Sequence, residues 1–158
     1  MTALFDVDRL ISQKRYAEAM ELLRRLNLGN MSEKDLGLYY ILMTEASLYH
    51  GNPVEDLIDK AIETYRYGAE TGLFGRAKYN KGWLLMSKGR FLEAREHLIE
   101  SFANYLRCNC KTDAARALNL LSFVETHCGQ FESALRSLDR CVALNCEAGL
   151  PERSRTAR

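Results

Sequence analysis

The sequence predicts an all-α protein made of stacked, antiparallel helix hairpins, about four in number. Its composition, 47% apolar with only two prolines, suits a helical protein, and two repeats carry the prediction. The segment Gly89-Arg-Phe-Leu-Glu-Ala94 returns 40 residues later as Gly129-Gln-Phe-Glu-Ser-Ala134. A fainter copy, Tyr16-Ala-Glu-Ala19, precedes Ala94 by 75 residues, or two periods of 37 to 38. Self-similarity at such a period indicates supersecondary units that stack on one another.

The first half of the chain predicts two hairpins. Apolar residues at helical spacing run through residues 3–13 and 16–26, which form the first hairpin and end at a break over residues 27–30. Ser32 is expected to cap the next helix, which continues to about residue 50 and is apolar on most sides.

The second helix of that hairpin is placed by its turn residues. Gly51 is expected to end the preceding helix, and Asn52-Pro53 to start the new one. This helix is expected to reach about Thr71 and to stop at Gly72, which gives a second hairpin over residues 32–71.

The second half predicts two more hairpins, over residues 74–108 and 112–146, with Gly89 and Gly129 at their turns. The tail, residues 150–158, is polar and basic, and is expected either to fray or to be the cut end of a longer protein. No capping helix follows the last pair, although the ends of a solenoid normally need one. We therefore expect a truncation, a dimer contact or a solvated last helix.

These hairpins resemble the tetratricopeptide repeat (TPR) family of helix–turn–helix units. In that motif a small residue in the first helix and an alanine in the second allow close packing, and an aromatic residue stands beside the glycine of the turn. The matching positions are Ala19 in the first repeat, Gly82, Gly89, Phe91 and Ala94 in the third, and Ser122, Gly129, Phe131 and Ala134 in the fourth. The match is good over residues 75–146, fair over 3–26 and poor over 36–71, where Leu57 replaces the alanine.

The resemblance implies a TPR-like right-handed superhelical solenoid whose first helices line a concave face. Its period near 40, against about 34 for the commonest form, is similar to the long-helix arrays of bacterial transcription regulators. The positions that would face the groove are Arg76, Tyr79, Asn80 and Trp83 in the third repeat and Arg116, Asn119 and Phe123 in the fourth. Arginine and asparagine can hold a carboxylate or backbone amides, and aromatic rings accept apolar side chains, so we expect a protein or peptide partner.

Other interpretations of these residues stay open. Trp83 and Phe123 are also compatible with the core, and the two arginines with solvated charges. Lys78 and Lys81 lie on a helix face that is expected to meet a neighbour. Their stems can reach past apolar surface to the rim, or their charges can pair with acids across a repeat boundary or meet a partner.

The cysteines and histidines give little support for a metal site, a cofactor or catalysis. Cys108, Cys110 and Cys146 fall near equivalent helix ends, but three ligands without a fourth make a poor zinc site. Reduced thiols in a cytoplasmic protein are the expectation for all five cysteines. The three histidines, His50, His97 and His127, are scattered, and no glycine loop for phosphate is present, so we expect no enzyme.

Charge and hydropathy exclude two further classes of function. A net charge of +1 gives no basic surplus for nucleic acid, and no apolar run is long enough to cross a membrane. The sequence therefore predicts a non-catalytic protein–protein interaction module. One alternative is a sensory or regulatory segment of a larger bacterial transcription regulator. Another is a self-association domain that forms a homodimer through Tyr39, Tyr40 and Tyr49.

Overall fold

A computed structural model describes residues 2–50 and 55–149. Within these ranges every regular element is a helix and no strand occurs, which confirms the all-α class. The elements are α1 (Thr2–Ser12), α2 (Tyr16–Arg25), the short 3₁₀ helix η1 (Leu28–Asn30), α3 (Glu33–His50), α4 (Glu55–Tyr65), α5 (Thr71–Ser87), α6 (Phe91–Arg107), α7 (Lys111–His127) and α8 (Phe131–Glu147).

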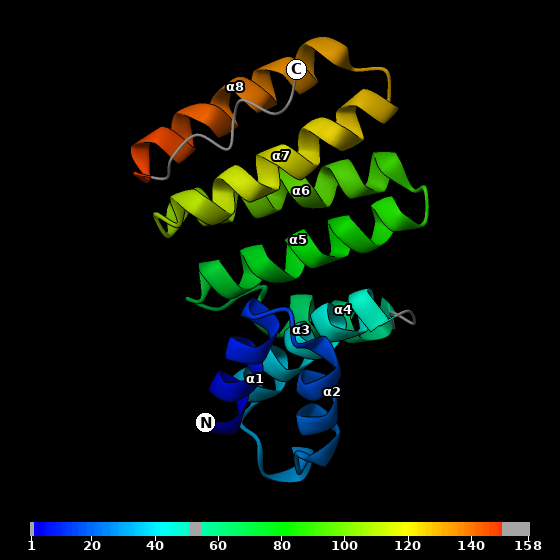
Figure 1. The fold of residues 1–158 in the computed structure, drawn as a ribbon, viewed down its shortest axis with the longest axis vertical. Helices are drawn as coiled ribbons and strands as arrows, with labels where there is room; N and C mark the ends of the chain where they lie inside the picture. Colours follow the sequence, from blue (N-terminus) through cyan, green and yellow to red (C-terminus); the bar gives the residue numbers. More distant parts are fainter. Residues whose placement is uncertain (1, 51–54, 150–158) are drawn as a thin grey trace.

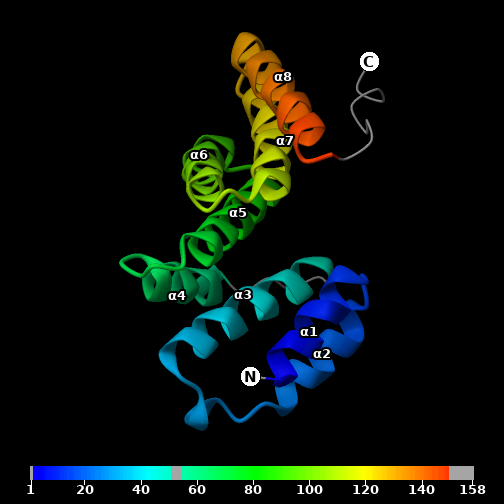
Figure 2. The ribbon, with the colours of Figure 1, turned by 90° about the vertical axis from the view of Figure 1, so that its left-hand side faces the viewer.

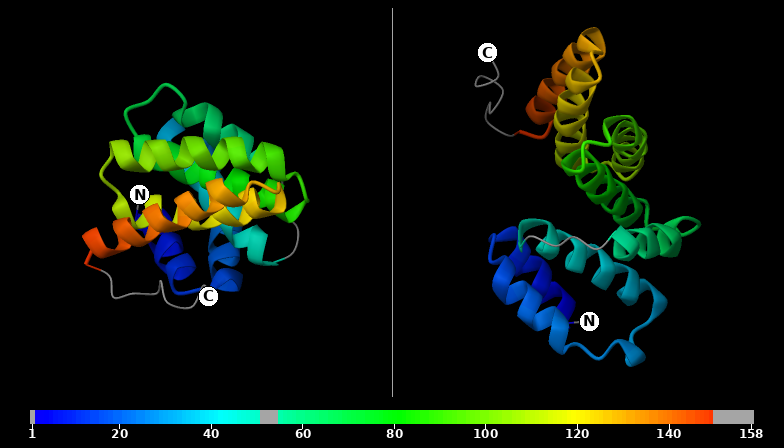
Figure 3. Two further views of the ribbon diagram at one scale, coloured as in Figure 1. Left: turned by 90° about the horizontal axis from the view of Figure 1, so that it is seen from above. Right: turned by 90° about the vertical axis from the view of Figure 1, so that its right-hand side faces the viewer.

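The helices are stacked in chain order. Figure 1 shows α5, α6, α7 and α8 following one another towards one end of the molecule, with α1 and α2 at the other end. Each helix packs mainly against the next in sequence, and lesser contacts join α1 to α3, α3 to α5 and α5 to α7. Figure 2 and Figure 3 show α1 and α2 side by side against α3, away from α7 and α8. Helix α5 therefore occupies the middle of the stack.

Four of the turns between successive helices share one backbone conformation. Gly89 and Gly129, the residues expected at two of the turns, have φ angles of +74° and +73°. Lys14 and Asn109 adopt the same left-handed conformation at the turns before α2 and α7, with φ angles of 61° and 57°. In each case the following amide reaches back to the preceding helix, as when the N–H of Gln130 donates to a carbonyl of α7 at 2.8 Å. The bond satisfies one of the last carbonyls of the helix, so the chain reverses at little cost.

Small residues set how closely the helices of a pair approach. A Cβ atom built on Gly82 would lie 2.6 Å from Cγ of Leu98, so α5 and α6 touch there with no room for a side chain. The other small positions of the repeat pattern, Ala19, Ala94, Ser122 and Ala134, are all buried. Phe91 packs against the core, but its counterpart Phe131 is 64% exposed, because no helix in the described part of the chain covers that side of α8.

The boundary between the second and third hairpins differs from the prediction. Helix α4 ends at Tyr65 rather than near Thr71, and α5 begins at Thr71, so Gly72 lies inside a helix that it was expected to stop. Tyr65 is buried and its hydroxyl donates to the carbonyl of Lys34 at 2.6 Å, which fixes the end of α4 against α3. A glycine costs a helix only about 1 kcal/mol, and tertiary packing overrides that cost. The predicted turn at Gly51 and Asn52-Pro53 lies outside the described residues.

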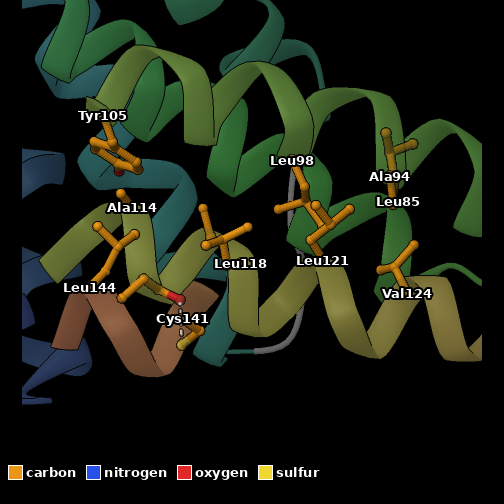
Figure 4. Close-up of a cluster of buried hydrophobic side chains, with 12 residues drawn as sticks. Leu85, Ala94, Leu98, Tyr105, Ala114, Leu118, Leu121, Val124, Cys141 and Leu144 are labelled. Atoms are coloured by element: carbon orange, nitrogen blue, oxygen red, sulfur yellow. Dashed lines mark hydrogen bonds between the residues drawn. The ribbon is translucent and has the colours of Figure 1, made fainter. Parts of the chain in front are cut away.

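The core is a series of three clusters, each shared by consecutive helices. One joins α1, α2 and α3, the next joins α3, α4 and α5, and the third joins α5 to α8. Figure 4 shows the third cluster, in which side chains of α6 and α7 meet along the length of both helices. A buried carboxylate, that of Glu125, lies between α7 and α8 and accepts hydrogen bonds from Ser133 at 2.6 Å and Ser137 at 2.8 Å. The stack thus has no single central core.

Candidate functional site

A groove with a volume of about 600 Å³ lies between α1, α3, α5 and α7. The start of α2 and the end of α6 also border it. Five of the seven residues predicted on the concave face line this groove. Four of them lie on α5, namely Arg76, Tyr79, Asn80 and Trp83, and the fifth, Arg116, lies on α7. Because α5 occupies the middle of the stack, its side chains can face helices that come before and after it in sequence.

The other two predicted residues lie outside the groove. Asn119 and Phe123 are exposed on α7, and neither lines the cavity. The ring of Phe123 is 49% exposed and lies 4.2 Å from the ring of His127, which in turn stacks on Phe91 at 4.7 Å. The structure therefore brings five of the predicted residues together and separates these two from them.

Arg76 forms ion pairs with carboxylates of the same chain. Its Nε and Nη2 atoms donate to the two oxygens of Glu45 at 2.7 and 2.6 Å, and Nη2 also donates to Asp8 at 2.7 Å. The amide of Asn80 donates to the same Glu45 carboxylate at 2.9 Å. Burial lowers the pKa of Arg76, but Glu45 and Asp8 outweigh burial and raise the pKa above its ordinary value. The guanidinium is therefore always charged, and it joins α5 to α1 and α3.

Glu45 and Asp8 were not predicted from the sequence to line this groove. Glu45 was detectable in principle, because it is a carboxylate within a helix that is otherwise mostly apolar. Such a charge usually has a partner, since an unpaired charge is costly to bury. Asp8 gave no comparable signal, because α1 is a short amphipathic helix with acids on its polar side.

Three aromatic rings form one wall of the groove. Tyr16 and Tyr49 are stacked, with ring centroids 4.2 Å apart and planes within 9°. Trp83 follows at 5.7 Å from Tyr49. Tyr49 was expected to form an exposed surface for self-association with Tyr39 and Tyr40, but Tyr39 is buried in the core and Tyr40 is half-buried. Tyr49 belongs instead to the groove, where it is 60% exposed.

The groove also carries a cation that is open to solvent. The guanidinium of Arg116 lies over the ring of Tyr79, 5.3 Å from its centroid, and Nη1 donates to Asp113 at 3.1 Å. The side chain of Arg116 is 62% exposed, against 25% for Arg76. The three acids and three bases that line the groove cancel in formal charge, so the groove is neutral and aromatic.

Lys78 and Lys81 lie on the opposite face of α5 and are buried. The ammonium group of Lys81 lies 2.8 Å from carboxylates of Glu55 and Asp59 on α4, and that of Lys78 lies 2.8 Å from Glu100 on α6. Lys81 therefore pairs with acids across a repeat boundary, which is one of the alternatives open at the sequence level, whereas Lys78 pairs with an acid of its own hairpin. Hydrogen bonds from Lys81 and Lys88 hold the pKa of Glu55 at about 2.

The cysteines and histidines do not gather in the groove. Within residues 2–50 and 55–149, no three acids, histidines or cysteines are placed to hold a metal ion. His97 is half-buried on α6, and burial lowers its pKa, whereas the side chain of His50 lies outside the described residues. Cys108 and Cys110 come together at the turn between α6 and α7, at the edge of the groove.

No protein-family model matches the chain, and comparison with curated proteins finds no relative. Among the described helices, none has the length and apolar character needed to cross a membrane.

Proposed function

We propose that the chain is a non-catalytic, cytoplasmic interaction module that binds a protein or peptide segment in its groove. We further propose that the helix pairs belong to a right-handed superhelical solenoid of the TPR type, with the groove on its concave side. The observation that carries the proposal is the wall formed by Tyr16, Tyr49 and Trp83 beside a cavity of about 600 Å³. Stacked, partly exposed rings that surround a hollow are typical of binding surfaces rather than of a core.

The chemistry of the groove favours an extended peptide. Tyrosine and tryptophan offer flat apolar faces together with hydroxyl and indole donors, so they bind apolar side chains and backbone carbonyls at once. The neutral lining does not favour a strongly charged ligand. A single anionic or carbonyl group on the ligand would face Arg116, whose guanidinium is exposed and donates one hydrogen bond to Asp113.

Arg76 has a different role in this proposal from the one that its position predicted. Its donors already bind two carboxylates, so a ligand carboxylate would have to displace Glu45 or Asp8. Displacement would leave a mostly buried charge unpaired, which costs several kcal/mol. Arg76 therefore shapes the groove, and Arg116 supplies the cation for the ligand.

The test compares variants of the exposed groove residues with a variant outside the groove. Wild-type protein, Tyr49→Ser, Arg116→Glu and the control Phe123→Ala would each be used to capture partners from an extract of the source cell, after circular dichroism shows equal helix content. A captured partner would then be titrated directly against each variant. We expect at least a tenfold loss of affinity, about 1.4 kcal/mol, for the first two variants and no loss for Phe123→Ala. Equal affinity for all four proteins would refute the groove as the binding site.

A second candidate function is a sensory or regulatory segment of a larger transcription regulator. The favouring observation is that α5, α6, α7 and α8 are each 17 residues long, which agrees with the longer helices that a period near 40 implies. The complete reading frame around this sequence tests it. A stop codon directly after Arg158 would refute this candidate and leave the first one unaffected.

A further inference from the structure

Two thiols meet at the turn between α6 and α7. Cys108 caps the end of α6, Cys110 caps the start of α7, and Asn109 between them has a φ angle of 57°. This left-handed residue reverses the chain, so that the thiol of Cys108 donates to the sulfur of Cys110 at 2.9 Å. A disulfide bond is about 2.05 Å long. The two sulfur atoms therefore need to approach by less than about 1 Å to bond.

The backbone holds this arrangement independently of the sulfur atoms. The N–H of Cys110 donates to the carbonyl of Tyr105 at 2.9 Å, and the N–H of Asn109 donates to the carbonyl of Leu106 at 3.0 Å. Tyr105 is buried in the third core cluster, so the turn is anchored to the interior. Groups fixed in this way react with each other as if at very high concentration.

The pair is accessible from the groove, and its Cys110 thiol is a weak acid. Cys110 lines the groove, and both thiols are half-buried. The hydrogen-bonded contact between the two sulfur atoms raises the pKa of Cys110 to about 11, with further contributions from burial and from the carboxylate of Asp113. The Cys110 thiol is therefore protonated near neutral pH and is a poor nucleophile there.

We infer that Cys108 and Cys110 are a redox-active dithiol that a low-molecular-weight disulfide, such as oxidised glutathione, converts into an intramolecular disulfide. The thiolate of Cys108 attacks one sulfur of oxidised glutathione, and the first glutathione thiolate leaves. The sulfur of Cys110 then attacks that of Cys108, forms the protein disulfide and releases the second glutathione. Two protein thiols are oxidised, one glutathione disulfide is reduced, and the two thiol protons pass to the two glutathione thiolates. The inference does not depend on a partner in the groove.

The sequence offers a direct assay, because trypsin cuts after Arg107 and Lys111 and releases the tetrapeptide Cys108-Asn-Cys-Lys111. Folded, fully reduced protein would be equilibrated with excess oxidised glutathione, quenched with N-ethylmaleimide under denaturing conditions, digested and examined by mass spectrometry. We expect the tetrapeptide to be unalkylated and lighter by two hydrogen atoms. Cys146→Ser, which removes an exposed cysteine elsewhere, should behave as wild type. Cys108→Ser and Cys110→Ser should instead give alkylated or glutathionylated tetrapeptide.

The same reaction in urea shows whether the fold promotes the disulfide. In the unfolded chain the two cysteines are still close in sequence, but the fold no longer holds their sulfur atoms together. We expect about tenfold more disulfide in the folded protein than in the unfolded chain at the same ratio of oxidised to reduced glutathione. Equal formation in both states, or an alkylated tetrapeptide from the folded wild type, would overturn the inference.

Discussion

Replacement of Arg76 by alanine removes the group that joins α5 to α1 and α3. Three charge-assisted hydrogen bonds of 2.6 to 2.7 Å are lost. The side chain of Glu45 is only 13% exposed, and it would keep one neutral donor, the amide of Asn80 at 2.9 Å. The loss of one partner of a buried ion pair costs about 3–5 kcal/mol. Asp8 is 42% exposed, so its ion pair with Arg76 is screened by solvent and contributes less than about 1 kcal/mol to stability.

We therefore expect Arg76→Ala to lower the free energy of unfolding by about 2–4 kcal/mol. This value is slightly below that of a fully buried ion pair, because the side of the pair that faces the groove is partly solvated. For a chain of this length the melting temperature would fall by about 5–12 °C. Urea unfolding followed by far-ultraviolet circular dichroism measures the change. Arg116→Ala is the matched control, since that side chain is 62% exposed, and it should cost less than about 1 kcal/mol.

A double-mutant cycle with Glu45→Ala isolates the pair from other effects of the substitution. The double variant should be less destabilised than the sum of the two single variants by at least about 1 kcal/mol. Our reasoning would be refuted if Arg76→Ala unfolded within about 0.5 kcal/mol of wild type. Arg76 would then be a solvated charge that remains available to a ligand.

Three more predictions concern packing and charge. Gly82→Ala should destabilise the fold by about 1–3 kcal/mol in urea unfolding, because the new Cβ would lie 2.6 Å from a buried leucine of α6. Gly72→Ala in the same helix is the control for this variant and should be neutral or stabilising, since its Cβ would have only an ordinary contact at 3.5 Å. The depressed pKa of Glu55, about 2, contributes stability that is present above pH 4.5 and is lost as the pH falls towards 2. Between pH 4.5 and 2, the free energy of unfolding of Glu55→Gln should therefore fall by about 1 kcal/mol less than that of wild type, a small difference because the carboxylate is partly exposed. An equal fall in both proteins would contradict this prediction. Ser137→Ala removes one of two hydroxyl donors to the buried carboxylate of Glu125 and should cost about 1.5–3 kcal/mol in urea unfolding.

The sequence predicted local features better than it predicted the groove. Gly89 and Gly129 could be placed at turns because a glycine in the left-handed conformation after a helix is a local signal. Gly72 was misread by the same rule, because a helix tolerates one glycine when tertiary packing compensates. The residues of a turn determine its conformation locally. Whether a helix continues through a glycine depends instead on tertiary contacts, which a single sequence does not reveal.

The groove was predicted only on the side where the repeat is regular. Four of its five predicted residues lie on α5, where the periodicity defines the face of the helix. Tyr16 and Glu45 were missed because they come from the first two hairpins, and their distance from α5 depends on how those hairpins pack. In the same way, the sequence placed Cys108 and Cys110 at a helix end, but the contact between their sulfur atoms depends on the conformation of Asn109.

The order in which the helices pack also has a consequence for folding. Because most contacts join helices that are adjacent in sequence, the chain can fold quickly and can open from an end without complete unfolding. Helix α8 packs chiefly on α7, so its amide hydrogens should exchange with solvent early. Helix α1 is also terminal, yet Arg76 binds Asp8 across 68 residues of chain, so α1 cannot separate from α5 without breaking that ion pair. Hydrogen exchange should thus be faster in the two terminal helices, α1 and α8, than in α5 at the middle of the stack.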